Sequence, residues 1–192
     1  MDIKKTINKI EQLPKWYGIA IVLICSLLLA ELFSTINYLV FADDLKDSMI
    51  SSFFKISYGV TVLSGIVIWI VSAVLFHLTA LLFNGKTLFS RFLFISSYPN
   101  IIIVFMILAS FLLIDSIQIT TTENIMTTLQ QNQSFKLAIN LVNYSFIPYY
   151  IMIIIIIHYV YNIKYLYSIL SVIIPASFTW LITEFFKWVQ II

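Results

Sequence analysis

The strongest constraint on this chain is a stretch from 56 to 83 with no Asp, Glu, Lys or Arg in 28 consecutive positions. A helix needs about 20 mostly apolar residues to cross the hydrocarbon core of a bilayer. The whole chain is 61% hydrophobic and only 10% charged, whereas ordinary soluble domains have roughly 25% charged residues. A soluble fold could not bury this much apolar surface, so the sequence predicts a membrane protein.

Four further runs have a similar length and polarity. Barrel strands would be about 10 residues long with strict alternation of apolar and polar positions, and these runs do not alternate. Helices satisfy their own backbone hydrogen bonds in lipid. The sequence therefore predicts an all-α, polytopic membrane protein in which residues 16–192 form one transmembrane domain, a bundle of five transmembrane helices at about 18–41, 56–83, 92–114, 144–163 and 166–187.

Residues 1–15 differ from the rest of the chain because they are basic and amphipathic. Apolar residues recur at helical spacing opposite three lysines, at Ile3, Ile7, Ile10 and Leu13 against Lys4, Lys5 and Lys9. This pattern favours a short helix on the membrane surface, with a frayed polar tail as the alternative. A cleaved signal peptide is disfavoured, because the following apolar run is too long and has no A-x-A-like cleavage site.

The distribution of Lys and Arg predicts the orientation. Seven cations precede the first span or lie in the second-to-third and fourth-to-fifth connections, at Lys4, Lys5, Lys9, Lys15, Lys86, Arg91 and Lys164. The opposite connections and the C-terminal end hold four, at Lys46, Lys55, Lys136 and Lys187. Cytoplasmic loops of membrane proteins carry the excess of cations, so the N-terminus is predicted in the cytoplasm and the C-terminus outside.

No sequence motif indicates an enzyme. The chain has none of the G-x-S-x-G, H-E-x-x-H, P-loop or C-x-x-C motifs, and we expect neither catalysis nor a cofactor. His77 and His158 are predicted near the cytoplasmic ends of their spans, where two imidazoles could begin a metal or proton-relay site. A catalytic zinc needs three protein ligands, so a structural role is favoured. The net charge of +2 gives no reason to expect nucleic acid as a partner.

Glu31 is the one charged residue well inside a predicted span other than the last. A carboxylate there costs on the order of 2.5–3.5 kcal/mol on insertion scales, so we expect it to face the bundle. By depth the predicted partners are Ser64, Tyr149, Thr179 and Thr183. The alternatives are a hydrogen-bonded packing contact, which is favoured, and a functional proton or ligand site.

The connection between the second and third spans contains Gly85, Lys86 and Arg91. A helix often ends on a residue with positive φ, where glycine costs little, so Gly85 is predicted to be that residue. Lys86 and Arg91 are interpreted as headgroup-level anchors that set the topology. A recognition or catalytic role for the two cations is the alternative.

Small and hydroxyl-bearing residues recur along the second span, at Ser57, Thr61, Gly65, Ser72 and Thr79. Such residues let helix backbones approach closely, either in the core of the bundle or at an intermolecular seam. On the predicted outer side, residues 43–47 form an acidic cluster that lacks the ligand spacing of an EF-hand loop. The long polar connection from 116 to 143 is predicted to contain a short surface helix near 123–129.

The connection after the second span resembles the central hairpin of the YIP (Ypt-interacting protein) superfamily. The shared features are a late histidine, a glycine turn, a hydroxyl and phenylalanine, and an aromatic-proline entry, here His77, Gly85, Thr87, Phe89, Tyr98 and Pro99. The stretch H-Y-V-Y-N-I-K-Y-L-Y-S-I-L-S-V-I-I-P, ending at Pro175, also resembles the end of the family. The resemblance covers about 56–190 and implies five spans with the N-terminus inside.

The chain also departs from that family. Asn84 stands where a first glycine is common, and the D-L-Y-G-P element of eukaryotic members is absent, so binding of Rab-type GTPases is not implied. The Ile-, Lys-, Asn- and Phe-rich composition suggests a bacterial member in the plasma membrane. We therefore expect a non-enzymatic scaffold or accessory subunit for other membrane proteins, such as a transporter or defence complex, with homo-oligomers possible. The alternative is a transporter or channel component that uses Glu31.

Overall fold

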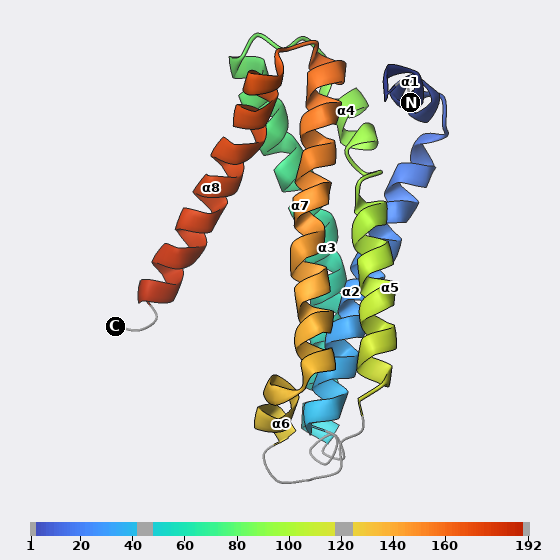
Figure 1. Ribbon diagram of the computed structural model, residues 1–192, viewed down its shortest axis with the longest axis vertical. Helices are drawn as coiled ribbons and strands as arrows, with labels where there is room; N and C mark the ends of the chain where they lie inside the picture. Colours follow the sequence, from blue (N-terminus) through green and yellow to red (C-terminus); the bar gives the residue numbers. More distant parts are fainter. Residues whose placement is uncertain (1–2, 42–47, 118–124, 190–192) are drawn as a thin grey trace. The chain divides into compact units, whose positions relative to one another are not determined.

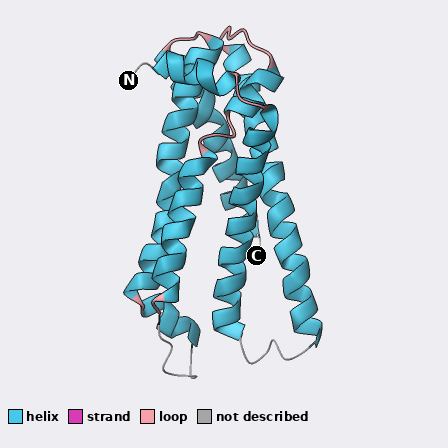
Figure 2. Cartoon of the chain, turned by 90° about the vertical axis from the view of Figure 1, so that its right-hand side faces the viewer, coloured by secondary structure: helices cyan, strands magenta, loops and turns pink. Residues whose placement is uncertain are grey.

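The computed structural model describes residues 3–41, 48–117 and 125–189, and these residues fold into helices joined by short turns, with no strand among them (Figures 1 and 2). Five helical segments are long and apolar enough to cross a membrane: Lys15–Phe41, Met49–Leu82, Phe89–Asp115, Gln133–Tyr161 and Tyr165–Ile182. Between 17% and 39% of the most apolar stretch of each segment is buried. So many exposed apolar side chains are stable in lipid but not in water, which confirms the prediction of an all-α membrane protein.

The helix order is α1 (Ile3–Glu11), α2 (Lys15–Phe41), α3 (Ser48–Leu82), α4 (Phe89–Ile95), α5 (Asn100–Asp115), α6 (Ile125–Gln131), α7 (Gln133–Tyr161) and α8 (Tyr165–Val189). In helix α1, Ile7 is buried and Lys4, Lys5 and Lys9 are exposed. Helix α6 lies within the predicted polar connection. The acidic cluster at 43–47 lies outside the described residues.

The third predicted span, 92–114, lies within the apolar segment Phe89–Asp115, in which a turn separates two helices. Helix α4 ends at Ile95, and a turn of four residues leads to α5, which begins at Asn100. Pro99 has no N–H to donate and disfavours helical geometry in the residue before it. The hydroxyls of Ser96 and Ser97 donate to the carbonyl oxygens of Leu93 and Phe94, at 2.8 and 2.5 Å, and so occupy acceptors at the end of α4.

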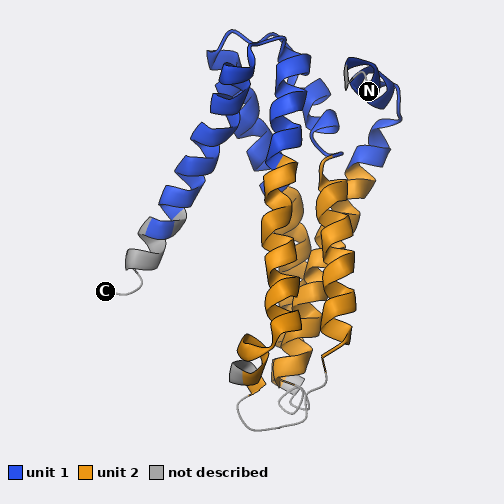
Figure 3. Ribbon diagram, viewed as in Figure 1, with its two compact units in different colours: residues 1–18, 68–98, 150–192 blue, residues 19–67, 99–149 orange. Residues whose placement is uncertain are grey.

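Contacts divide the chain into two compact units (Figure 3). Unit 1 comprises 1–18, 68–98 and 150–192, and unit 2 comprises 19–67 and 99–149. Helices α2, α3 and α7 contribute residues to both units. Unit 1 holds α1, α4, α8 and the turn that follows α3, and unit 2 holds α5 and α6.

Hydroxyl groups connect helices inside each unit. In unit 2, the buried Ser110 hydroxyl on α5 lies 2.8 Å from the Met106 carbonyl oxygen of its own helix and 2.9 Å from that of Ala138 on α7. In unit 1, the Thr79 hydroxyl lies 2.8 Å from the carbonyl oxygens of both Leu75 and Ser171. Each hydroxyl thus has one carbonyl acceptor in its own helix and one in a neighbouring helix. Such bonds satisfy the hydroxyl in lipid, where no water can accept from it.

The small-residue face of α3 has two uses. Gly65 packs against Ser26 of α2, where an added Cβ would collide with the serine hydroxyl, and Thr79 bonds to α8. Both positions are half-buried and pack within the chain. Ser57 and Thr61 instead line an open groove between α2 and α3.

Thiol labelling tests the predicted orientation. With the buried Cys25 replaced by alanine, cysteines introduced at the exposed Lys86 and Gln131 are separated by one span. In intact cells an impermeant thiol reagent should label Gln131→Cys and leave Lys86→Cys unlabelled until the membrane is permeabilised. The reverse labelling would place the cation-rich connections outside and overturn the orientation.

Candidate functional site

The connection after α3 is built around Asn84 rather than Gly85. Asn84 has a φ of 61°, and no glycine among the described residues has positive φ, so the prediction for Gly85 was wrong. The Gly85 N–H donates to the Ala80 carbonyl oxygen at 3.0 Å and the Asn84 N–H to that of Leu81 at 3.0 Å. This pair of bonds is a Schellman motif, in which asparagine takes the left-handed position because its short side chain tolerates that conformation.

Gly85 is required for a different reason, which is close packing. It is buried, and a Cβ placed on it would lie 2.8 Å from the Ala80 carbonyl oxygen and 2.8 Å from Cδ1 of Tyr161. The Tyr161 ring is itself almost completely buried, at 2% exposure, and has little room to move. The glycine therefore lets the connection pack against the end of α7.

In unit 1, the side chains of His77 and Tyr161 form a polar pair near the C-terminal ends of α3 and α7. His77 Nδ1 and the Tyr161 hydroxyl are 2.5 Å apart, within hydrogen-bond distance. Phe89 lies 5.2 Å from the His77 ring, and Phe92 lies 5.4 Å from the Tyr161 ring in an edge-on arrangement. The pair thus joins α3 to α7, and the aromatic side chains of Phe89 and Phe92 on α4 pack against it.

His158 has a separate role in the turn between α7 and α8. Its Nδ1–H donates to the Ile163 carbonyl oxygen at 2.6 Å, and its ring stacks on Tyr165 at 3.7 Å between centroids. Asn162 takes a φ of 55° in this turn, as Asn84 does in the other. His77 and His158 are therefore each bonded to a different partner, and no group of three His, Cys, Asp or Glu in the described part of the chain could hold a metal ion.

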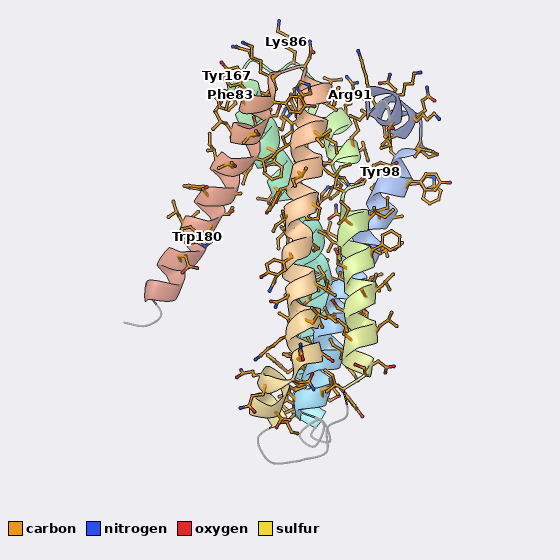
Figure 4. All side chains as sticks on the ribbon, viewed as in Figure 1. Phe83, Lys86, Arg91, Tyr98, Tyr167 and Trp180 are labelled. Atoms are coloured by element: carbon orange, nitrogen blue, oxygen red, sulfur yellow. The ribbon has the colours of Figure 1, made fainter. Side chains whose placement is uncertain are left out.

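The two predicted anchors differ in their surroundings. Figure 4 labels Lys86 and Arg91, and Lys86 is exposed. Arg91 forms an ion pair with Glu11, in which Nε and Nη2 donate to one carboxylate oxygen at 2.9 and 2.6 Å. This ion pair connects α4 to α1, so Arg91 contributes to the packing of these two helices as well as to the predicted orientation. Also in unit 1, the ring of Phe83 stacks on the ring of Tyr167, with 5.2 Å between the ring centroids.

Glu31 does not face the other helices of unit 2, contrary to the prediction. It is exposed, and its carboxylate has no hydrogen bond or ion pair among the described residues. No bond joins it to Ser64 or Tyr149, the two predicted partners in unit 2. Thr179 belongs to unit 1, and the side chain of Thr183 lies outside the described residues. The sequence identified the unusual residue correctly and its surroundings incorrectly, because helix depth does not specify which way a side chain points.

The exposed face of α2 around Glu31 has a regular spacing. Ile24, Leu27, Glu31, Ser34 and Tyr38 are all exposed and follow one another at intervals of three, four, three and four residues. This is the heptad spacing of the contact positions in a two-helix seam. Sequence reasoning missed the pattern because it runs through residues of very different polarity.

A groove lies beside this face within unit 2. Its volume is about 560 Å³, and it is lined from α2 and α3 by apolar and polar residues, the polar ones including Ser34, Asn37, Tyr38, Lys55, Ser57 and Thr61. Ser34 and Tyr38 belong to both the groove and the heptad face. Polar side chains are therefore concentrated on one part of the apolar surface of unit 2.

Comparisons of the chain with protein-family models, with curated proteins and with solved structures give no match. The function has to be inferred from the residues themselves.

Substituting the glycine of the turn tests the packing account of unit 1. Gly85→Ala should lower stability by about 1–3 kcal/mol, because the new methyl group overpacks a buried contact. The matched control is Gly59→Ala, since an added Cβ at Gly59 meets nothing within 4 Å. Thermal unfolding in detergent measures both variants. Equal unfolding temperatures for the two variants would show that Gly85 is not needed for packing.

Proposed function

We propose that this chain is a non-enzymatic accessory subunit or scaffold that binds another integral membrane protein through the exposed face of α2. The observation that carries the proposal is the carboxylate of Glu31, which lies on the surface of a membrane-spanning helix without a bonding partner among the described residues. We assign the chain to the YIP type on the sequence resemblance alone, and the same resemblance and composition suggest a bacterial plasma membrane.

The position of Glu31 along α2 makes exposure to lipid costly. Trp16 and Tyr17 are exposed and stacked at 4.0 Å, as expected of residues at the membrane interface. If the hydrocarbon begins near Gly18, Glu31 lies about 20 Å into a core about 30 Å thick, at 1.5 Å per residue. The nearer edge is then about 10 Å away, farther than a glutamate side chain reaches.

A helix from another protein would remove this cost. Membrane helices commonly cross at about +20°, the geometry that heptad spacing produces. A partner with a hydroxyl, amide, imidazole or cationic group opposite Glu31 would supply the missing hydrogen bond. The groove beside the face adds Asn37 and Lys55 as further polar contacts. A second copy of this chain is an alternative occupant, in which the two Glu31 side chains would face one another.

Two substitutions separate a bond to a partner from a bond within the chain. Glu31→Leu should leave the purified chain as stable as the wild type or more stable, because no described intrachain bond is lost. The same change should weaken binding to the partner by about threefold to twentyfold, the range for interhelical hydrogen bonds in membranes. Glu31→Gln keeps a hydrogen-bonding group and should retain most of the binding.

The measurements are thermal unfolding of the purified chain and co-purification of the partner in mild detergent, confirmed by tagging the partner. A loss of about 1–2 kcal/mol in the purified Glu31→Leu chain would show that the carboxylate is bonded within the chain. If Glu31→Gln kept the partner but abolished ion flux in proteoliposomes, the transporter or channel alternative would replace the accessory role.

A further inference from the structure

A second polar pocket lies in unit 1, where α1 and the start of α2 meet α4. Its volume is about 200 Å³, and its lining combines two cations with one acid, two hydroxyl groups and four apolar side chains. The charged and hydroxyl-bearing residues are Glu11, Lys15, Ser90, Arg91 and Tyr98, and the apolar ones are Ile10, Leu13, Phe94 and Ile95. We propose that this pocket binds the phosphodiester headgroup of an anionic phospholipid.

The charge of the lining suits a single negative charge. Lys15 and Arg91 are cations and Glu11 is an anion, so the three side chains together carry one net positive charge. A phosphodiester carries one negative charge. The bonds from Arg91 Nε and Nη2 to Glu11 leave both N–H groups of Nη1 for another acceptor. A guanidinium presents such donors in a planar fork that matches phosphate oxygens.

Lys15 is held in place by an aromatic ring. Its Nζ lies 5.2 Å from the centre of the Phe94 ring, within the range of a cation–π contact. Gly18 brings the start of α2 close to α4, because a Cβ there would lie 3.2 Å from the Phe94 carbonyl oxygen and would collide with the Ser97 hydroxyl. The close approach places Lys15, which is exposed, beside α4 at the edge of the pocket.

The apolar part of the lining favours a lipid over a free phosphate ion. Leu13 is 45% exposed, and Trp16 and Tyr17, which follow Lys15, are 60% and 43% exposed. Apolar and aromatic side chains beside cations are the composition of a site at the membrane interface, where headgroup and acyl chain meet. A phosphate ion in water would gain nothing from this apolar surface.

Lipid titration of the purified full-length chain in mild detergent tests the site. Native mass spectrometry counts bound dioleoyl phosphatidylglycerol against dioleoyl phosphatidylcholine. The wild type should prefer the anionic lipid, and Lys15→Gln and Arg91→Gln should each reduce the preference by about fivefold, the effect of one cation near an anionic headgroup. Lys86→Gln is the matched control, because Lys86 is a cation in the connection between α3 and α4 but does not line the pocket. It should change the preference less than twofold.

Two further arms separate headgroup binding from helix packing and from binding of a free ion. Glu11→Gln keeps an oxygen that can accept from Arg91 and should retain the preference. If Glu11→Gln and Arg91→Gln reduced it equally, the residues would only hold α1 against α4, and the proposal would be overturned. If Lys86→Gln reduced the preference as much as Arg91→Gln, the lipid would be attracted by the overall positive charge rather than by the pocket. The proposal would then be overturned. Displacement of the lipid by millimolar inorganic phosphate would show a site for the free ion instead.

Discussion

Every polar group that enters the hydrocarbon must find a partner there, since lipid offers no water to bond it. Two hydroxyls of the spans follow this rule by donating to carbonyl oxygens. Ser110 and Thr79 each lie within hydrogen-bond distance of one carbonyl in their own helix and one in a neighbouring helix. The same bonds therefore satisfy a polar group and fix two helices together. Among the described residues, the carboxylate of Glu31 and the buried indole N–H of Trp69 lack such a bond, and the carboxylate motivates the proposed partner.

The ends of the helices solve the same problem for the backbone. The Schellman bonds after α3 satisfy carbonyl oxygens that the helix leaves unpaired, and the histidine at the end of α7 donates to the Ile163 carbonyl oxygen. Asn84 and Asn162 both adopt positive φ, so the two turns of unit 1 use the same residue type for the same conformation. Gly85 contributes the space that brings its turn against Tyr161.

The sequence predicted the helices of this structure better than the directions and partners of individual side chains. The spans and the amphipathic helix α1 were predictable, because length, polarity and spacing leave few alternatives for apolar runs. The break between α4 and α5 was missed although Pro99 indicated it, because the run on both sides is uniformly apolar. Side-chain direction could not be predicted for Glu31, since it depends on which neighbours a helix finds. The pairing of Arg91 with Glu11 was also missed, because the two residues are 80 positions apart.

The central claim is that another protein covers Glu31 in the membrane. The most direct test is to keep Glu31, place a photo-crosslinking amino acid at Leu27, which is exposed one turn before Glu31 on the same face of α2, and irradiate intact membranes. Phe105 on α5 is the control position, since it is 66% exposed on another span of unit 2. The account predicts a discrete protein adduct from Leu27 and only lipid adducts from Phe105. An adduct with the mass of two chains would identify a second copy as the partner. Lipid adducts alone from both positions would contradict the account.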